Sequence, residues 1–157
     1  MRLAIVVNSF PSISETFIFN KVMGLRQKGV DVAVWTHSSK NDERFFEKQL
    51  DGIHVDFVKK TILAHTKFFV PLVVSIYFLR NPMAALQLLF RAKKLYKHFP
   101  RAIKAWILSL PFALHKYDLI HFEYSGLAVT YLDAIPLIRP SKIITSCRGH
   151  RSKSIAT

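Results

Sequence analysis

Apolar and polar positions follow one another in blocks that predict a strand, a helix and a second strand at the start of the chain. Leu3–Val7 is a continuous apolar run rich in β-branched residues, which is typical of a parallel strand covered on both faces. The segment from about residue 15 to residue 28 has apolar residues at helical spacing, and Gly29 follows it where a helix C-terminus favours glycine. Val30–Trp35, which includes Asp31, predicts the second strand.

The next part of the chain predicts a loop, a third strand and an apolar helix. His37–Leu50 is polar and charged, as expected of a loop, and Ile53–Val58 alternates as a strand does. Phe68–Leu79 is the longest apolar run. It is too short to cross a bilayer, which takes about 20 residues, so we expect a buried or interfacial helix.

Two further helices are marked by prolines. Asn81 as N-cap and Pro82 at the first helical position predict a helix that extends to Phe99. Another helix is expected to begin near Pro100, and Pro111 is expected to kink or end it.

The remaining blocks complete an alternation of strands and helices. Asp118–Phe122 predicts a fourth strand, Gly126–Ile138 a helix, and Lys142–Cys147 a fifth strand. This alternation predicts an α/β fold, with a Rossmann-like doubly wound parallel sheet in a single domain that spans residues 1–157. In such sheets the first strand commonly borders the fourth, and ligands bind beyond the carboxyl ends of the strands.

The turns after the first, fourth and fifth strands would therefore line one cleft. Their hydroxyls, amides and carboxylates suit the binding of a polyol by hydrogen bonds. The expected substrate-binding residues are Asn8, Ser9, Ser14, Glu15, His121, Glu123, Tyr124, Ser125, Gly126, Arg148 and Gly149. Ser12, Ser146, Cys147 and His150 lie in the same turns.

Several of these residues also have an ordinary structural interpretation. Ser12 and Glu15, three apart, have the spacing of a capping box. His121 lies in an apolar strand, where a hydrogen-bonded core histidine is the commoner case, and His121 with Glu123 lacks the third ligand that a metal site needs. Arg148 is the best candidate for a phosphate contact, with a structural salt bridge as its alternative.

Basic residues strongly outnumber acidic residues in the chain. The chain has 157 residues, with 23 Lys and Arg against 10 Asp and Glu, and a formal net charge of +13. This excess implies an acidic partner.

Cys147 is the one cysteine, so no internal disulfide can form and a reducing, cytoplasmic setting fits. Cys147 is expected to be a small buried residue. No dinucleotide-binding glycine pattern, Walker motif, nucleophile elbow or paired-cysteine zinc pattern is present.

The excess of bases is concentrated in a helical insertion at about residues 59–116. No Asp or Glu occurs from Phe57 to Tyr117. Gln87, Arg91, Lys94 and His98 form a polar stripe on the first proline-marked helix, and Trp106 and Tyr96 are available for an interface. A basic amphipathic helix suits an anionic membrane surface, with contacts expected from Arg91, Lys94, Lys97, Arg101 and Lys104. The alternative is a core helix with a basic solvated edge. Nucleic acid is not expected, because no recognition motif occurs.

Three segments resemble a known family. Phe10–Ile18, Phe-Pro-Ser-Ile-Ser-Glu-Thr-Phe-Ile, closely resembles the F-P-x-x-S-E-T-F-I segment that opens many bacterial group 1 (family 4) glycosyltransferases. Tyr117–Phe122 is similar to their later D-I/L-I-H strand, and Ser146–His150 to their S-x-R/H-G segment. Many relatives carry His where this chain has Arg148, so either Arg148 or His150 is expected to contact substrate.

The resemblance implies a retaining enzyme of the two-domain GT-B fold that transfers a sugar from a nucleotide sugar to a glycan or lipid-linked acceptor in polysaccharide biosynthesis. It implies that this chain is the N-terminal, acceptor-side half. Together with the basic helices, this gives an expected cytoplasmic location, peripheral at the inner face of the cytoplasmic membrane. The nucleotide sugar, a co-substrate, would be held mainly by a C-terminal domain that we expect to be absent, so the chain alone is expected to be inactive. No metal or other cofactor is expected. The alternative is a non-catalytic Rossmann-like module that binds anionic membrane or a partner protein.

Overall fold

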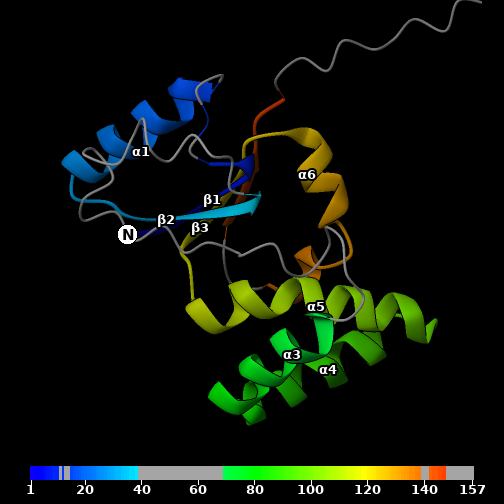
Figure 1. The fold of residues 1–157 in the computed structure, drawn as a ribbon. Coiled ribbons are helices and arrows are strands. Elements are labelled where there is room, and N and C mark those ends of the chain that lie inside the picture. Colours follow the sequence, from blue (N-terminus) through cyan, green and yellow to red (C-terminus); the bar gives the residue numbers. More distant parts are fainter. Residues whose placement is uncertain (11, 13–14, 39–68, 139–141, 148–157) are drawn as a thin grey trace, which may run out of the picture.

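The centre of the molecule is a sheet of parallel strands with helices on both sides (Figure 1). The computed structural model describes residues 1–10, 12, 15–38, 69–138 and 142–147. The described strands, in the spatial order β2-β1-β3-β4, are β1 (Arg2–Ser9), β2 (Asp31–Ser38), β3 (Leu119–Phe122) and β4 (Lys142–Thr145). All three strand pairs are parallel, which confirms an α/β sheet compatible with a Rossmann-like fold.

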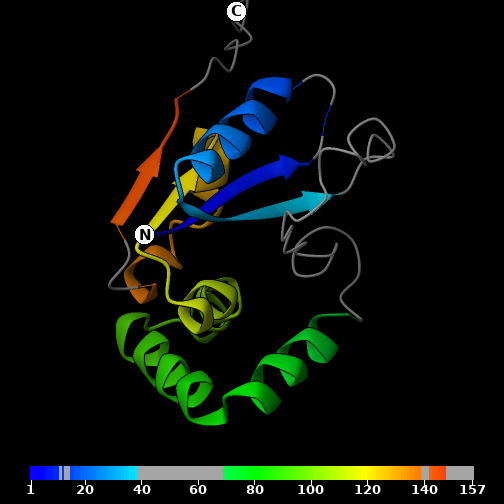
Figure 2. The same ribbon diagram turned by 90° about the vertical axis from the view of Figure 1, so that its left-hand side faces the viewer.

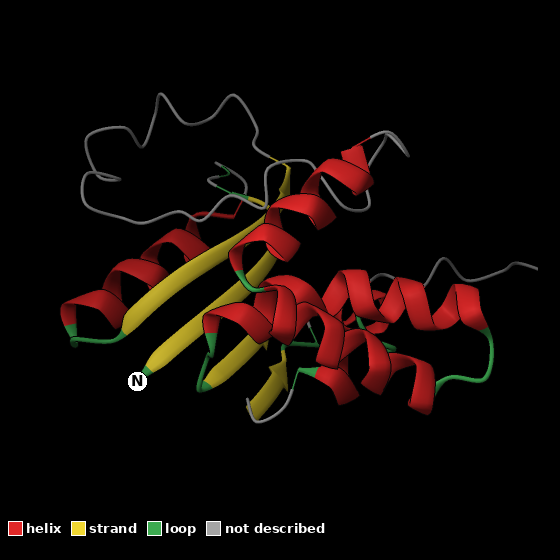
Figure 3. Ribbon diagram, turned by 90° about the horizontal axis from the view of Figure 1, so that it is seen from below, coloured by secondary structure: helices red, strands yellow, loops and turns green. Residues whose placement is uncertain are grey.

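The helices form layers around this sheet. The described helices are α1 (Thr16–Gln27), α3 (Phe69–Arg80), α4 (Pro82–Leu95), α5 (Phe99–His115), α6 (Ser125–Thr130) and the 3₁₀ helix η2 (Ile135–Leu137). Helix α1 packs on one face of the sheet, and α5 and α6 pack on the other. Helices α3 and α4 lie beyond α5, as the view in Figure 2 shows. Figure 3 shows the same strands between their flanking helices from below.

The alternation of side chains in β1 builds two cores at once. Leu3, Ile5 and Val7 are buried against α1, whereas Ala4 and Val6 are buried on the side of α5 and α6. A strand covered on both faces needs apolar residues at every position, which is what the continuous run provides. The predicted contact between the first strand and the Asp118–Phe122 strand is confirmed, because β1 pairs with β3 over four positions that begin at Leu3.

Two helix ends confirm the capping signals. Asn81 accepts a hydrogen bond from the Ala84 amide at 3.2 Å, and Pro82 begins α4. Gly29 follows α1 with φ of 77°, a left-handed conformation that favours glycine. The prediction that α4 extends to Phe99 is wrong. The helix ends at Leu95, because the backbone becomes extended at the next residue and α5 begins at Phe99.

The predicted helix end at Pro111 is wrong, and the helical segment after β3 is divided into two elements. Helix α5 continues through Pro111 to His115, because Phe112 is buried against Trp35 and Tyr131 and holds the last turns in place. The segment from Gly126 to Ile138, expected to be helical in outline, comprises most of the short helix α6 and then η2. Pro lacks an amide hydrogen and restricts the residue before it, so Pro136 starts a new turn.

Part of the predicted fold lies outside the described residues. The expected strand Ile53–Val58 falls there, as does most of the expected loop after His37, although His37 itself belongs to β2. The second strand is therefore longer than the predicted Val30–Trp35, and the last strand ends at Thr145, two residues before Cys147.

Candidate functional site at the carboxyl ends of the strands

Polar side chains gather where β1, β3 and β4 end. The backbone continues the sheet a little further here, since the Glu123 amide donates to the Val6 carbonyl at 3.1 Å and the Ser146 amide donates to the Phe122 carbonyl at 2.9 Å. These bonds fix the chain just after two neighbouring strands. Three parallel neighbours end side by side, so the residues that follow them share one edge of the sheet.

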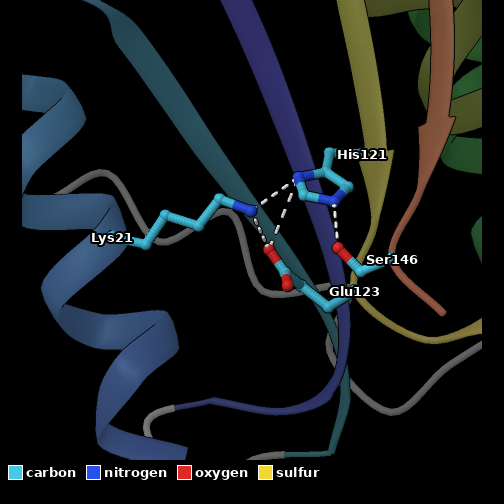
Figure 4. A network of polar contacts seen from close by, with 4 residues as sticks. All are labelled: Lys21, His121, Glu123 and Ser146. Atoms are coloured by element: carbon cyan, nitrogen blue, oxygen red, sulfur yellow. Dashed lines mark hydrogen bonds and ion pairs between the residues drawn. The ribbon is translucent and has the colours of Figure 1, made fainter. Parts of the chain in front are cut away.

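Four side chains from three elements form a hydrogen-bonded network at this edge (Figure 4). The Lys21 ammonium, from α1, lies 2.7 Å from Nδ1 of His121 and 2.5 Å from Oε1 of Glu123. The other ring nitrogen of His121 lies 2.8 Å from Oγ of Ser146. Glu123 is fully buried and His121 is 7% exposed, so the ion pair between Lys21 and Glu123 is shielded on its acidic side.

The network determines which nitrogen of His121 carries the proton. An ammonium group can only donate, so Nδ1 must accept from Lys21 and the ring hydrogen lies on Nε2. Nε2 then donates to the Ser146 hydroxyl. Ser146, which is half-buried, thereby keeps its own hydroxyl hydrogen for another acceptor. The Ser146 hydroxyl is therefore a hydrogen-bond donor at this edge, and its orientation is set by the contacts from Lys21 to His121 and from His121 to Ser146.

A second pair links the turn after β1 to the turn after β3. The Tyr124 hydroxyl donates to Oε1 of Glu15 at 2.5 Å. Glu15 is the N-cap residue of α1, but its side chain makes no capping hydrogen bond, so the capping-box interpretation is wrong for Glu15. Its amide does donate to the Ser12 carbonyl at 3.0 Å. The carboxylate instead joins two segments that lie 109 residues apart in the sequence.

Each of these two carboxylates has one oxygen without a partner among the described residues. Oε2 of Glu15 and Oε2 of Glu123 are both buried and lack a hydrogen bond there. Buried polar atoms are nearly always paired, so such oxygens are typical of places where a ligand or water completes the bonding. Carboxylate acceptors and a hydroxyl donor are the kinds of group that pair with a sugar hydroxyl, which both donates and accepts.

The other residues expected in the cleft have mixed positions. Asn8 is exposed near the end of β1 and Ser9 is buried, where it pairs with Ser38 in the ladder. Ser125 begins α6, and Gly126 is exposed in its first turn. Ser14, Arg148, Gly149 and His150 lie outside the described residues. His121 proves to be both a buried, hydrogen-bonded histidine and a member of the edge network.

Lys21 was missed by the sequence-based prediction. It lies in the middle of α1, where a lysine normally extends into solvent, and nothing in its neighbours marks it as different. The feature that could have predicted a cation here is the pair His121, in β3, and Glu123, directly after it. These two polar residues follow an apolar run, and a carboxylate that is buried there needs a cation. Cys147 is exposed, which corrects the interpretation of it as a buried residue.

No metal site accompanies this edge in the part of the chain that the structure describes. No three His, Cys, Asp or Glu side chains there lie close enough together to hold an ion. A hollow of about 290 Å³ lies instead at the start of β2, lined by Arg26, Gly29, Val30, Asp31 and Val32. The hollow lies at the amino end of β2, away from the carboxyl ends of the strands.

Three residues of the basic helices, among them the expected membrane contact Arg101, make hydrogen bonds within the protein. Arg101 donates to Asp133 from Nε at 3.0 Å and from Nη2 at 2.7 Å, and this bonding raises the pKa of its guanidinium. Trp106 is buried and its indole donates to the Ala85 carbonyl at 2.9 Å. The Tyr96 hydroxyl donates to the Asp133 carbonyl, and burial raises the pKa of that phenol. Arg101, Trp106 and Tyr96 therefore hold the helices together.

Comparisons of the chain with protein-family models, with curated proteins and with solved structures find no match. None of the helices in the described ranges is both long and apolar enough to cross a membrane. Two features of the chain bear on its function: the geometry of the edge network, and the resemblance of three sequence segments to group 1 glycosyltransferases.

Proposed function

We propose that the chain is the acceptor-side domain of a glycosyltransferase, which transfers a sugar from a nucleotide sugar to a glycan or lipid-linked acceptor in polysaccharide biosynthesis. The observation that carries the proposal is that the three family-like segments meet. Glu15 comes from the first, His121 from the second and Ser146 from the third, and hydrogen bonds tie their surroundings into one edge. The Glu15 carboxylate and the Tyr124 hydroxyl that it binds after β3 are 109 residues apart, and His121 and Ser146 are 25 residues apart.

The chemistry of this edge suits a saccharide. Glu15 and Glu123 each offer a buried oxygen that has no partner among the described residues, and Ser146 offers an oriented hydroxyl hydrogen. In the proposed enzyme the fold is the doubly wound, N-terminal half of a GT-B architecture, and the acceptor hydroxyl lies against these groups. A second Rossmann-like domain binds the nucleotide sugar and faces the same edge. Sugar transfer then breaks the bond between the sugar and its phosphate and forms a bond to the acceptor oxygen with retained configuration.

The test is sugar transfer by the chain combined with a donor-binding domain, assayed with a panel of nucleotide sugars and lipid-linked acceptors. Glu15→Gln keeps the shape of the side chain and removes its charge. Because a hydrogen bond to a charged group contributes about 1.5–3 kcal/mol, we expect turnover to fall about tenfold to a hundredfold. Asp31→Asn is the matched control, since Asp31 is an exposed carboxylate whose ion pair with Arg2 is remote from the edge.

Two results would overturn the proposal. One is equal turnover by Glu15→Gln and by the control variant. The other is failure of the folded, assembled protein to use any nucleotide sugar in the panel, which would favour a non-catalytic module.

A further inference from the structure

The outer face of α4 combines exposed apolar side chains with exposed bases. Met83 is 66% exposed and Phe90 is 68% exposed. They lie seven residues apart, which places them about 10 Å apart along the helix axis and within about 20° of each other around it. Large apolar side chains that point into solvent from one line of a helix indicate a surface that something covers.

Bases border this apolar line on both sides. At about 100° per residue, Lys93 lies on one side of Phe90, and Lys94 and Arg91 lie on the other. All three are exposed, and the ammonium of Lys93 also lies 5.5 Å from the centre of the Phe99 ring. The opposite side of α4 carries Ala85, Leu88 and Ala92, which are buried against α5. The helix therefore has its own core face, and the Met83–Phe90 line is additional to it.

The helices that carry and flank this line contain bases and no acidic residue. Leu79 and Arg80, at the end of α3, are exposed just before it, and the exposed Lys97 follows it. The whole sequence between Phe57 and Tyr117 contains no acidic residue. Lysine is depleted in protein–protein interfaces, and a nucleic-acid surface does not need a central apolar line. An anionic lipid surface matches both features, because acyl chains accept the apolar groups and headgroups pair with the bases.

We infer that the outer face of α4 docks on an anionic bilayer, with Met83 and Phe90 inserted below the headgroups and Arg91, Lys93 and Lys94 paired with lipid phosphates. The lysine and arginine side chains are long enough to reach outward from a helix that lies in the interface. Arg101 takes no part, because Asp133 already holds it. This face is separate from the edge with Glu15 and Ser146, so the inference does not depend on sugar transfer.

The test is co-sedimentation of the full chain with phosphatidylglycerol-containing vesicles and with pure phosphatidylcholine vesicles. We expect Phe90→Ser to weaken binding to the anionic vesicles about tenfold, and Arg91→Gln with Lys94→Gln to weaken it about 30-fold. Val129→Ser removes an equally exposed apolar side chain from α6 and should bind as the unaltered chain does. Lys28→Gln with Lys142→Gln removes the same charge from other elements and should have a much smaller effect.

A second measurement follows insertion directly. A Phe90→Trp variant should show tryptophan emission at shorter wavelength when anionic vesicles are added, because its indole enters an apolar environment. Equal binding to neutral and anionic vesicles would overturn the inference. So would equal losses in the face variants and their controls, or vesicle binding by Phe90→Trp without an emission shift.

Discussion

Removing Lys21 should destabilise the protein by leaving a carboxylate buried without its cation. The Glu123 side chain is fully buried, and the Lys21 side chain is 28% exposed. Breaking a fully buried pair by removing one partner costs about 3–5 kcal/mol. Water can enter the space that the partly exposed lysine leaves, so we expect Lys21→Met to lower the free energy of unfolding by about 2–3 kcal/mol. His121 also loses the donor to its Nδ1 atom.

A double-mutant cycle separates this effect from lost packing. Glu123→Gln alone leaves a lysine that can still reach water, and should cost about 1 kcal/mol. In the double variant no unpaired charge remains, and the Gln amide can donate to His121. We expect the double variant to lose only about 1 kcal/mol, which corresponds to a coupling of about 2 kcal/mol between the two sites.

Urea unfolding followed by circular dichroism measures these differences, provided that the slope of the transition is the same in all variants. Lys28→Met is the matched control, since Lys28 is exposed at the end of the same helix and its loss should change stability by less than about 0.5 kcal/mol. A Lys21→Met variant as stable as this control, or strictly additive effects in the cycle, would refute the reasoning.

Three other predictions concern stability and are checked by the same urea titration. Trp106→Phe removes the donor to the Ala85 carbonyl and part of a buried ring, so we expect a loss of about 2–4 kcal/mol; a loss below about 1 kcal/mol would contradict that contact. Asn81→Ala removes the acceptor for the Ala84 amide and should cost about 1 kcal/mol, whereas an unchanged midpoint would show that α4 does not need this cap. Burial raises the pKa of Tyr131 above its ordinary value of 10.0. The unfolded chain then loses that proton first as the pH rises, so stability should fall above about pH 10, and more steeply than in Tyr131→Phe; equal slopes would contradict the burial argument.

Much of the fold was predictable because its signals are local. The continuous apolar run at Leu3–Val7 requires two covered faces, and the caps at Asn81 and Gly29 depend on a few neighbouring residues. The failures occurred where tertiary packing outweighs a local rule. Pro111 does not end α5, since burial of Phe112 against the sheet stabilises the turns beyond it.

The candidate site was predictable in position but only partly in composition. Parallel strands bring their carboxyl ends to one edge, so the turns near Glu15, His121 and Ser146 could be expected to meet. The inclusion of Lys21 could not, because it depends on how α1 is rotated on the sheet. The role of Arg101 likewise depends on Asp133, which lies 32 residues later in the sequence and beyond β3.

The position of α5 between two layers has a consequence for how the molecule opens. Helix α4 contacts α5, α3 and η2, whereas α5 itself packs on the sheet through Leu108 and Phe112. The α3–α4 pair can therefore detach while the sheet and α5 stay folded. If α5 detached from the sheet first, the apolar residues on both of its faces would be exposed. Amide hydrogens of α4 should exchange with solvent earlier than those of α5, and those of β1 last. A graded pattern of this kind would make the outermost helices a separate cooperative unit, able to adapt to a surface without loosening the edge where Glu123 is buried.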